Sequence, residues 1–224
     1  YFKRHDGQAV TCDDFAQAIA DANPDSPLTQ HLADFKRWYS QAGTPTLHAR
    51  GVYDAQARSY TLTLRQQLAP TPGQPDKLPS VMPVALGLLA ADDGRALPLQ
   101  LQGEAAAGGT DRVLVLTEAE AQYTFINVDN APVPSLLRGY SAPVQLDDGL
   151  DDAALLLQLQ HDSDAFNRWE AGQRLALGRM LAALAPGAEL RLDDAFVQAM
   201  RAVLRHDALD PAFKALVLTP PTEQ

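Results

Sequence analysis

Apolar residues recur at helical spacing in the first zone of the chain, residues 1–43. Thr11 stands before Asp13 and Asp14, an arrangement typical of a hydroxyl N-cap followed by carboxylates in the first helical turn. The apolar positions that follow predict a helix that ends at Asn23, because the next residue is a proline.

A second apolar stripe follows in the same zone. Leu28, Leu32 and Phe35 recur at the spacing of one helix face. They predict a second short helix that ends near Trp38 and Tyr39. The two predicted helices form a hairpin that is too small to fold alone.

In the middle zone, residues 44–146, apolar residues recur about every second position instead of at helical spacing. Short alternating runs that contain β-branched and aromatic residues predict strands. The predicted strands are Tyr60–Leu64, Val84–Leu89, Val113–Leu116 and Tyr123–Val128.

Turn residues separate these strands. Asp93-Gly94 and Gly108-Gly109 are hairpin signals, and Pro132 and Pro134 are expected to stand before the last strand. Several short strands over about 100 residues favour an all-β, immunoglobulin-like sandwich.

Helical spacing returns in the last zone, residues 147–224, where aspartates precede each apolar run. Successive short helices favour a bundle or the opening of an α-solenoid, although no fixed repeat of motif residues is visible. The predicted helix starts are Asp151-Asp152, Asp162 to Asp164, Asp193-Asp194 and Asp210-Pro211.

The composition is that of a globular protein, with 224 residues of which 46% are hydrophobic. A net charge of -10 disfavours nucleic acid and anionic membranes as partners, and the longest nearly apolar run, Val81–Ala91, is too short to cross a bilayer. Cys12 is the only cysteine, which excludes an intrachain disulfide and fits a reducing cytoplasm. The start at Tyr1, with neither Met nor a signal pattern, suggests a piece of a longer protein.

Five pairs of adjacent aspartates are the first candidates for chemistry. Adjacent carboxylates can hold a hard cation or share acid and base roles, but none of these stretches has the ligand spacing of an EF-hand. Most of the pairs precede predicted helices, so we interpret them as caps that compensate the helix dipole. The pairs are Asp13-Asp14, Asp92-Asp93, Asp147-Asp148, Asp151-Asp152 and Asp193-Asp194.

The histidines and the cysteine form no recognisable catalytic motif. The H-E-x-x-H motif of zinc hydrolases is absent. His5, His161 and His206 each precede an aspartate, but neighbours in sequence rarely form a relay, so solvated or helix-end histidines are favoured. Cys12 could pair with His5 as a thiol dyad; its place in a first helical turn favours a small buried or half-buried thiol. Nucleotide-binding glycine loops are absent as well.

Aromatic residues lie on the apolar faces of two predicted helices. Trp38-Tyr39, and Phe166 with Trp169, could form a sugar platform or a hot spot for a partner. Their helical spacing favours packing in the core or between the zones.

Longer blocks carry a resemblance to a known family. YFKRHDGQAVTCDDF opens the chain, and FKRWYSQAGTP follows at Phe35–Pro45. APVPSLLRGYSAPVQL at Ala131–Leu146 and HDSDAFNRWEAGQRL at His161–Leu175 come later. Along essentially its whole length the chain resembles bacterial aminopeptidase N, a family of zinc metallopeptidases of the gluzincin type.

The resemblance implies an architecture. Residues 1–43 would be the helical end of a catalytic domain, residues 44–146 a β-sandwich domain, and residues 147–224 the first helices of a superhelical C-terminal domain. The intact enzyme would use zinc to remove N-terminal amino acids from peptides by attack of water. The family's H-E-x-x-H motif and G-x-M-E-N loop are absent from this sequence. The resemblance therefore assigns no catalytic, cofactor-binding or metal residue here, and zinc is expected only in the parent.

Two hypotheses follow. In the first, the chain is an inactive, non-catalytic fragment of a cytoplasmic aminopeptidase N that acts as a scaffold, with the remaining domains as its partners and peptides as substrates of the intact enzyme. The alternative is a free-standing sandwich whose loops, such as the proline-rich loop 70–79, bind a protein or a glycan.

Overall fold

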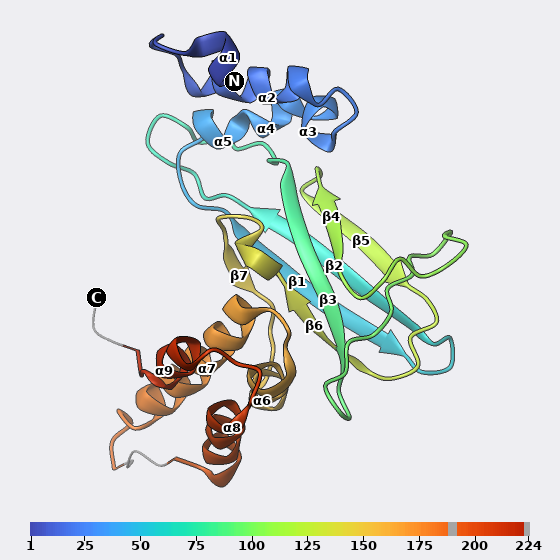
Figure 1. Ribbon diagram of the computed structural model, residues 1–224, viewed down its shortest axis with the longest axis vertical. Helices are drawn as coiled ribbons and strands as arrows, with labels where there is room; N and C mark the ends of the chain where they lie inside the picture. The colour runs from blue at the N-terminus through green and yellow to red at the C-terminus, as the bar shows by residue number, and fades with distance from the viewer. Residues whose placement is uncertain (188–191, 222–224) are drawn as a thin grey trace.

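The computed structural model describes residues 1–187 and 192–221. Figure 1 shows short N-terminal helices above one end of a pair of β-sheets and longer helices, from the C-terminal part, beside the sheets. The order of helices, strands and helices is the one that the apolar spacing predicts.

The N-terminal helices begin with strong local signals. In α2 (Cys12–Ala22), Asp14 N donates to Thr11 Oγ1 and the Asp14 carboxylate accepts from Thr11 N at 2.9 Å, which is a capping box. The first predicted helix is therefore confirmed. The other helices of this group are single turns: α1 (Phe2–His5), α3 (Pro27–Gln30), α4 (Leu32–Phe35) and α5 (Arg37–Ser40).

The prediction of one second helix is wrong, because that segment is broken into α3, α4 and α5. His31 takes φ -121° and ψ 24°, outside the helical range, between α3 and α4. Thr29 Oγ1 lies 3.0 Å from the carbonyl oxygen of Ala20 and 2.7 Å from that of Asn23. These contacts tie the turn to the end of α2 instead of letting the helix continue.

Among the described residues, seven strands form two facing sheets. One sheet has the order β5-β2-β1-β7 and the other β4-β3-β6. The pairs are antiparallel except β1 with β7, which is parallel. The strands are β1 (Thr46–Asp54), β2 (Ser59–Gln67), β3 (Met82–Ala90), β4 (Arg112–Leu116), β5 (Glu120–Phe125), β6 (Pro132–Leu136) and β7 (Gln145–Asp147).

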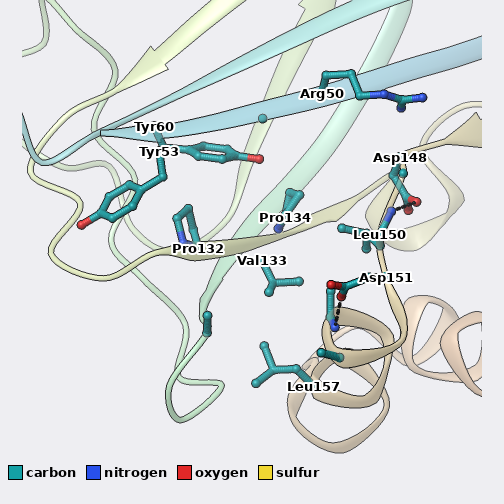
Figure 2. Close-up of a pocket in the computed structure, with 15 residues that line it drawn as sticks. Arg50, Tyr53, Tyr60, Pro132, Val133, Pro134, Asp148, Leu150, Asp151 and Leu157 are labelled. Carbon is teal, nitrogen blue, oxygen red and sulfur yellow. Dashed lines mark hydrogen bonds between the residues drawn. The ribbon is translucent and has the colours of Figure 1, made fainter. Parts of the chain in front are cut away.

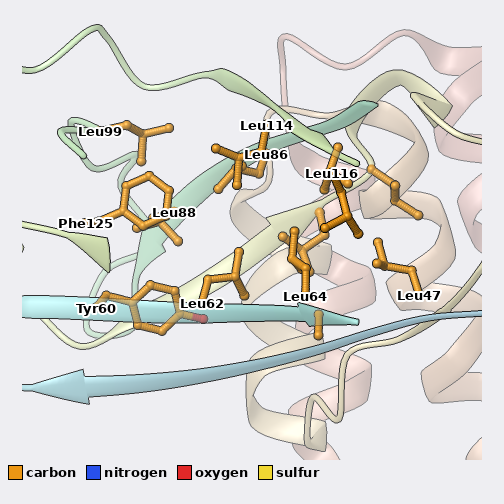
Figure 3. Packing of buried hydrophobic residues seen from close by; sticks show 14 of the residues in the cluster. Leu47, Tyr60, Leu62, Leu64, Leu86, Leu88, Leu99, Leu114, Leu116 and Phe125 are labelled. Atoms are coloured by element: carbon orange, nitrogen blue, oxygen red, sulfur yellow. The ribbon is translucent and has the colours of Figure 1, made fainter. Parts of the chain in front are cut away.

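Leucines from both sheets fill the space between them. Side chains alternate along a strand, so Leu62 and Leu64 of β2 both point inward, toward Leu86 and Leu88 of β3. Figure 3 shows these leucines packed with Phe125, which is also completely buried. This layer is the core of the predicted sandwich.

Two strand predictions are wrong at their limits. Pro132 and Pro134 lie within β6 and not before the last strand, which is β7. β6 is an edge strand, and an edge tolerates residues without an N–H donor. The strand predicted for residues 123–128 ends at Phe125, because Asn127 has a left-handed φ of 58°.

The C-terminal helices pack around a second apolar cluster that includes Leu159, Leu175 and Val203. Each helix follows an aspartate whose carboxylate accepts backbone N–H groups of the first turn, as predicted. Within the described residues, no helix combines the length and apolar character needed to cross a membrane. The helices are α6 (Asp152–His161), α7 (Ala165–Ala182), α8 (Asp194–Arg205) and α9 (Pro211–Leu218).

Candidate functional site at the domain junction

Arg138 is a buried cation at the end of β6. The chain leaves β6 through a short 3-10 helix, η1 (Arg138–Tyr140), where Leu137 and Gly139 have φ angles of 54° and 61°. This left-handed turn places the Arg138 side chain against β3, where it is only 7% exposed. A Cβ added to Gly87 would lie 2.3 Å from Arg138 Cζ, so the guanidinium needs glycine at that position.

Arg138 joins three segments. Its Nε donates to Ser135 Oγ at 2.9 Å, its Nη1 donates to Asp111, and its Nη2 donates to Asp162 Oδ1 at 3.3 Å. Asp111 precedes β4 and is largely exposed, whereas Asp162 follows α6 and is 0% exposed. The pair of Arg138 and Asp162 therefore connects the sandwich to the helices in a place shielded from solvent.

The link between α6 and α7 folds around this pair. Asp164 N donates to Asp162 Oδ1 at 2.9 Å, and Arg168 Nε donates to the carbonyl oxygen of Asp162 at 3.0 Å. The Asp164 carboxylate accepts from Gly139 N of η1 at 2.7 Å. Residues of this short link thus bond to their own helices and to the sandwich.

Side chains of α6 and α7 also close the outer edge of β6. Gln158 Nε2 donates to the carbonyl oxygen of Pro134 at 2.9 Å. Asn167 Nδ2 donates to the carbonyl oxygen of Leu136 at 2.9 Å and to Ser135 Oγ at 2.8 Å. Proline removes donors from this edge and the two amides satisfy its acceptors, so the edge offers little to another strand.

A second ion pair lies at the junction. Arg174 of α7 forms two 2.8 Å hydrogen bonds with the carboxylate of Asp148, which lies between β7 and α6. These bonds raise the pKa of Arg174 above its ordinary value, and burial raises the pKa of Glu170, which also faces Arg174. A bidentate ion pair fixes the relative orientation of the two side chains as well as the distance between them.

Burial dominates the electrostatics of Asp162. It raises the pKa of Asp162 above the ordinary aspartate value, and the charge of Arg138 only partly opposes this effect. Burial also lowers the pKa of Arg168. Among the described residues, Asp162 Oδ2 and Arg168 Nη1 have no hydrogen-bond partner. A buried cluster of this kind contributes orientation more than net stability.

The capping interpretation of the paired aspartates is confirmed for three pairs. Asp14, Asp151 and Asp193 each accept a backbone N–H at the start of a helix. Hydrogen bonds from the Thr11 backbone and hydroxyl lower the pKa of Asp14, and that from Phe196 N lowers the pKa of Asp193.

For Asp147-Asp148 the capping interpretation is wrong. Asp147 Oδ2 lies 2.8 Å from His48 Nδ1, and Asp147 Oδ1 accepts from Arg50 Nη2 at 2.9 Å. The hydrogen bonds from His48 and Arg50 lower the pKa of Asp147. Both carboxylates are occupied by side chains from other elements, because the pair ends a strand instead of starting a helix.

The histidines do not gather at one place. His161 packs against the turn after β3, where a Cβ on Gly94 would lie 2.3 Å from its ring, and His206 follows α8 as its C-cap. In the part of the chain that the structure describes, no three His, Cys, Asp or Glu side chains form a group that could hold a metal ion. These residues do not fit the zinc centre that the resemblance implies for the intact enzyme.

Cys12 differs from expectation. It is exposed at the first position of α2, so the interpretation as a buried or half-buried thiol is wrong.

The aromatic residues mostly pack between zones, as predicted. Trp38 lies against the sandwich core and its Nε1 donates to the carbonyl oxygen of Val81 at 2.8 Å. The Phe166 ring of α7 is 5.4 Å from the Tyr140 ring of η1, across the junction. Tyr39 is 47% exposed, so the core prediction is wrong for that residue.

The sequence did not identify Arg138 and Asp162 as partners. They lie in two of the blocks that carry the resemblance, 24 residues apart. An arginine directly after an apolar strand, and an aspartate between two helices, were the available signals. Neither signal specifies its partner, because the contact depends on how the two domains pack.

The junction defines the class of this chain: an immunoglobulin-like sandwich joined to a group of packed helices. Residues 43–149 match a domain of unknown function with an Ig-like fold (DUF3458), and residues 152–224 match the companion domain described as ARM repeats (DUF3458_C). Both the all-β and the helical parts of the predicted fold class are confirmed.

Relatives give a more particular assignment. The chain is 39% identical to aminopeptidase N of Escherichia coli over 99% of its own length, and 40% identical to that of Caulobacter vibrioides over 100%. It is 34% identical to aminopeptidase N of Haemophilus influenzae, also over 100%. It spans about a quarter of these proteins, 25%, 24% and 25% of their lengths respectively.

A solved structure agrees. The crystal structure of Legionella pneumophila aminopeptidase A in complex with aspartic acid matches 99% of this chain with a TM-score of 0.77 and 26% identity. This chain covers 23% of that protein. The chain is therefore homologous, along its whole length, to a segment of bacterial aminopeptidase N, and its residues 43–149 and 152–224 match the Ig-like and ARM-repeat models.

Proposed function

We propose that this chain is the connecting segment of a zinc-dependent aminopeptidase and that its role is structural. Identity of 34% to 40% with aminopeptidases N across the whole chain supports this proposal. The remaining domains of the parent are its partners. In this proposal those domains hold the zinc and remove N-terminal amino acids from peptides in the cytoplasm, and this chain alone is inactive.

The buried pair of Arg138 and Asp162 is the observation that carries the structural role. A flexible linker between domains would be exposed and polar, with few contacts across it. Here Gln158 and Asn167 of the helices satisfy carbonyl groups of β6, and the ion pair is enclosed between the domains. Such a junction holds the helices at a fixed angle to the sandwich.

An exposed apolar surface supports a place within a larger protein. Leu177, Leu181 and Leu184, along and just after α7, are exposed. Beside them, a groove of about 390 Å³ between α7, α8 and α9 is lined by apolar side chains that include Met180 and Phe196. Apolar surface of this kind is typical of protein interfaces, and it disfavours the alternative of a free-standing sandwich module.

Metal content and peptidase activity test the proposal directly. The purified chain is analysed for zinc by mass spectrometry and for hydrolysis of alanyl and arginyl chromogenic amides. We expect neither zinc nor turnover from the chain, and both from the longer protein that contains it. Stoichiometric zinc with turnover in the chain alone would mean that the active site lies within it.

The structural role needs a second test in the longer protein. Arg138→Met is expected to shorten the half-life of peptidase activity at elevated temperature while the zinc content and the initial rate stay unchanged. Arg95→Met, in an exposed ion pair with Asp92 and Asp93, is the matched control and leaves the half-life unchanged. An equal half-life for both variants would remove the support for a scaffold built on the junction.

A further inference from the structure

The edge of β1 is paired over only part of its length. β2 pairs along all of β1, but β7 pairs with β1 only at Thr46–His48. Alternate residues of an antiparallel strand direct their N–H and C=O away from the partner. Pro45 O accepts from Gln145 N on the β7 side, so the odd-numbered residues of β1 face this edge. Gly51 and Tyr53 continue that row, and no described strand pairs with them there.

The neighbouring edge strand differs from β1 in this respect. At β6, prolines remove the donors and the amides of Gln158 and Asn167 occupy the acceptors. At β1, Arg50 Nη1 donates to the carbonyl oxygen of Ala49. No described side chain occupies the backbone groups of Gly51 and Tyr53 on this edge in the same way. Val52, whose side chain points to the other face, is 71% exposed.

A groove of about 520 Å³ follows this open edge, a size within the roughly 300–1,000 Å³ typical of ligand sites. Its walls are the backbone of β1 at Gly51 and Tyr53 and, opposite, β6 at Pro132–Pro134; Leu157 of α6 lies at one end (Figure 2). The groove therefore has an unpaired strand on one side and an apolar wall on the other.

The side chain of Tyr60, a mostly buried residue, brings its hydroxyl to the same groove. Its side chain is 3% exposed, and a Cβ added to Gly51 would lie 1.9 Å from Tyr60 Oη. Glycine at position 51 thus lets the hydroxyl reach the open edge. Among the described residues the Tyr60 hydroxyl makes no hydrogen bond with a side chain or a backbone group. A tyrosine hydroxyl is neutral near pH 7 and can both donate and accept, and burial raises the pKa of Tyr60 further above its ordinary value.

The charged side chains around the groove already have partners. Arg50 bonds to Asp147, and Asp148 bonds to Arg174 at 2.8 Å. The Asp151 carboxylate accepts a backbone N–H at the start of α6. A ligand of this groove therefore needs no net charge. Within the part of the chain that the structure describes, the groups that remain without a hydrogen bond here are the backbone of Gly51 and Tyr53 on this edge and the hydroxyl of Tyr60.

We propose that this groove binds an extended, uncharged peptide segment of a partner protein, which adds a strand to β1 at Gly51 and Tyr53 and hydrogen-bonds to Tyr60. The incoming strand continues the row that β7 begins on this edge, so the main chain supplies the recognition.

Amide hydrogen exchange, followed by NMR on the full 224-residue chain, tests the proposal. The probes are acetylated and amidated pentapeptides built from Gly, Ser, Thr and Val, together with the same peptides N-methylated at every residue, which have no N–H donor on either edge. We expect the Gly51 and Tyr53 amides to exchange fast in the free chain and at least about tenfold more slowly with the unmodified peptides. The methylated peptides leave both rates unchanged because they cannot pair. The amides of Arg50 and Val52, which face β2, stay protected throughout and serve as internal controls.

A pair of tyrosine variants tests the role of the hydroxyl. Tyr60→Phe is expected to weaken peptide binding about fivefold to tenfold, the usual effect of one lost hydrogen bond. Tyr123→Phe is the control, since the Tyr123 hydroxyl donates to the carbonyl oxygen of Val115 away from the groove, and it leaves the affinity unchanged. The proposal is overturned if no unmodified peptide slows exchange at Gly51 and Tyr53, if both amides are already protected in a dimer of the free chain, or if both variants bind equally.

Discussion

Arg138, just after β6, and Asp162, just after α6, are 24 residues apart in the sequence and 3.3 Å apart in the structure. Both side chains are buried, and the bond between them joins the sandwich to the helices, although Arg138 also pairs with Asp111 of the sandwich. We infer that this bond couples the folding of the sandwich to that of the helices, and the first predictions concern it.

Replacing Arg138 by methionine keeps the apolar stem and removes the charge. Asp162 would remain buried without its cation, which typically costs about 3–5 kcal/mol in the free energy of unfolding. Urea denaturation followed by circular dichroism measures the change. Arg95→Met removes a charge from an exposed pair and is expected to leave the urea midpoint unchanged. Equal losses in the two variants would show that the buried pair has no special role.

Gly87→Ala tests the space that the guanidinium of Arg138 occupies. The new Cβ would lie 2.3 Å from Arg138 Cζ, so the arginine must move away from Asp162, and we expect a loss of about 1–3 kcal/mol. Gly178→Ala is the matched control, because, apart from its chain neighbours and the backbone of its own helix, no atom of another described residue lies within 4 Å of the added Cβ, and Gly178 lies inside α7. There we expect a gain of up to about 1 kcal/mol, since alanine favours helix. The same denaturation measurement contradicts the prediction if both variants change stability in the same direction.

The raised pKa of Asp162 predicts a pH dependence of definite sign. A carboxyl whose pKa is higher in the folded than in the unfolded chain favours folding at low pH, and this contribution is lost as the pH rises through the folded value. Asp14, Asp147 and Asp193 have lowered pKa values and act in the opposite direction, losing stability as the pH falls.

Comparison with Asp162→Asn isolates the single group. The free energy of unfolding of the native chain, minus that of the variant, is expected to decrease as the pH is raised above 3.8, the ordinary aspartate value. Urea titrations at a series of pH values provide both quantities. A difference that is constant or increases with pH would mean that Asp162 is not held in an environment that disfavours its charge.

Two tryptophans report separately on the two domains. Trp38 lies against the sandwich core, and Trp169 packs against the helical cluster. In the single-tryptophan variants Trp169→Phe and Trp38→Phe, fluorescence is expected to give the same urea midpoint, because the junction couples the domains. When Arg138→Met is added to each, the midpoints should separate. Midpoints that already differ without that change would show that the domains unfold independently.

Local patterns account for what the sequence predicted well. The capping box at Thr11 and Asp14 and the aspartate caps of α6 to α9 involve residues within three positions of each other, so their effect does not depend on the rest of the fold. Strands such as β2 and β3 were predicted because large apolar residues alternate or run together in them.

β1 was not predicted as a separate strand. Its inward positions carry Leu47, Ala49, Gly51 and Tyr53, and small residues in this row give almost no apolar period. Gly51 is small because the Tyr60 ring covers it from the neighbouring strand. The glycine that admits the Tyr60 ring is therefore also a residue that weakens the apolar period of β1.

The sequence by itself determined the order of helices, strands and helices, the helix starts, and the relationship to aminopeptidase N, because these follow from neighbouring residues and from their identity along the chain. Only the tertiary structure decided that Arg138 meets Asp162 and that Asp147 and Asp148 form ion pairs instead of caps. It also decided that no described strand pairs with the β7 side of β1 beyond His48. These features depend on which distant segments pack together, and a carboxylate or a strand edge has the same local sequence whether or not a partner reaches it.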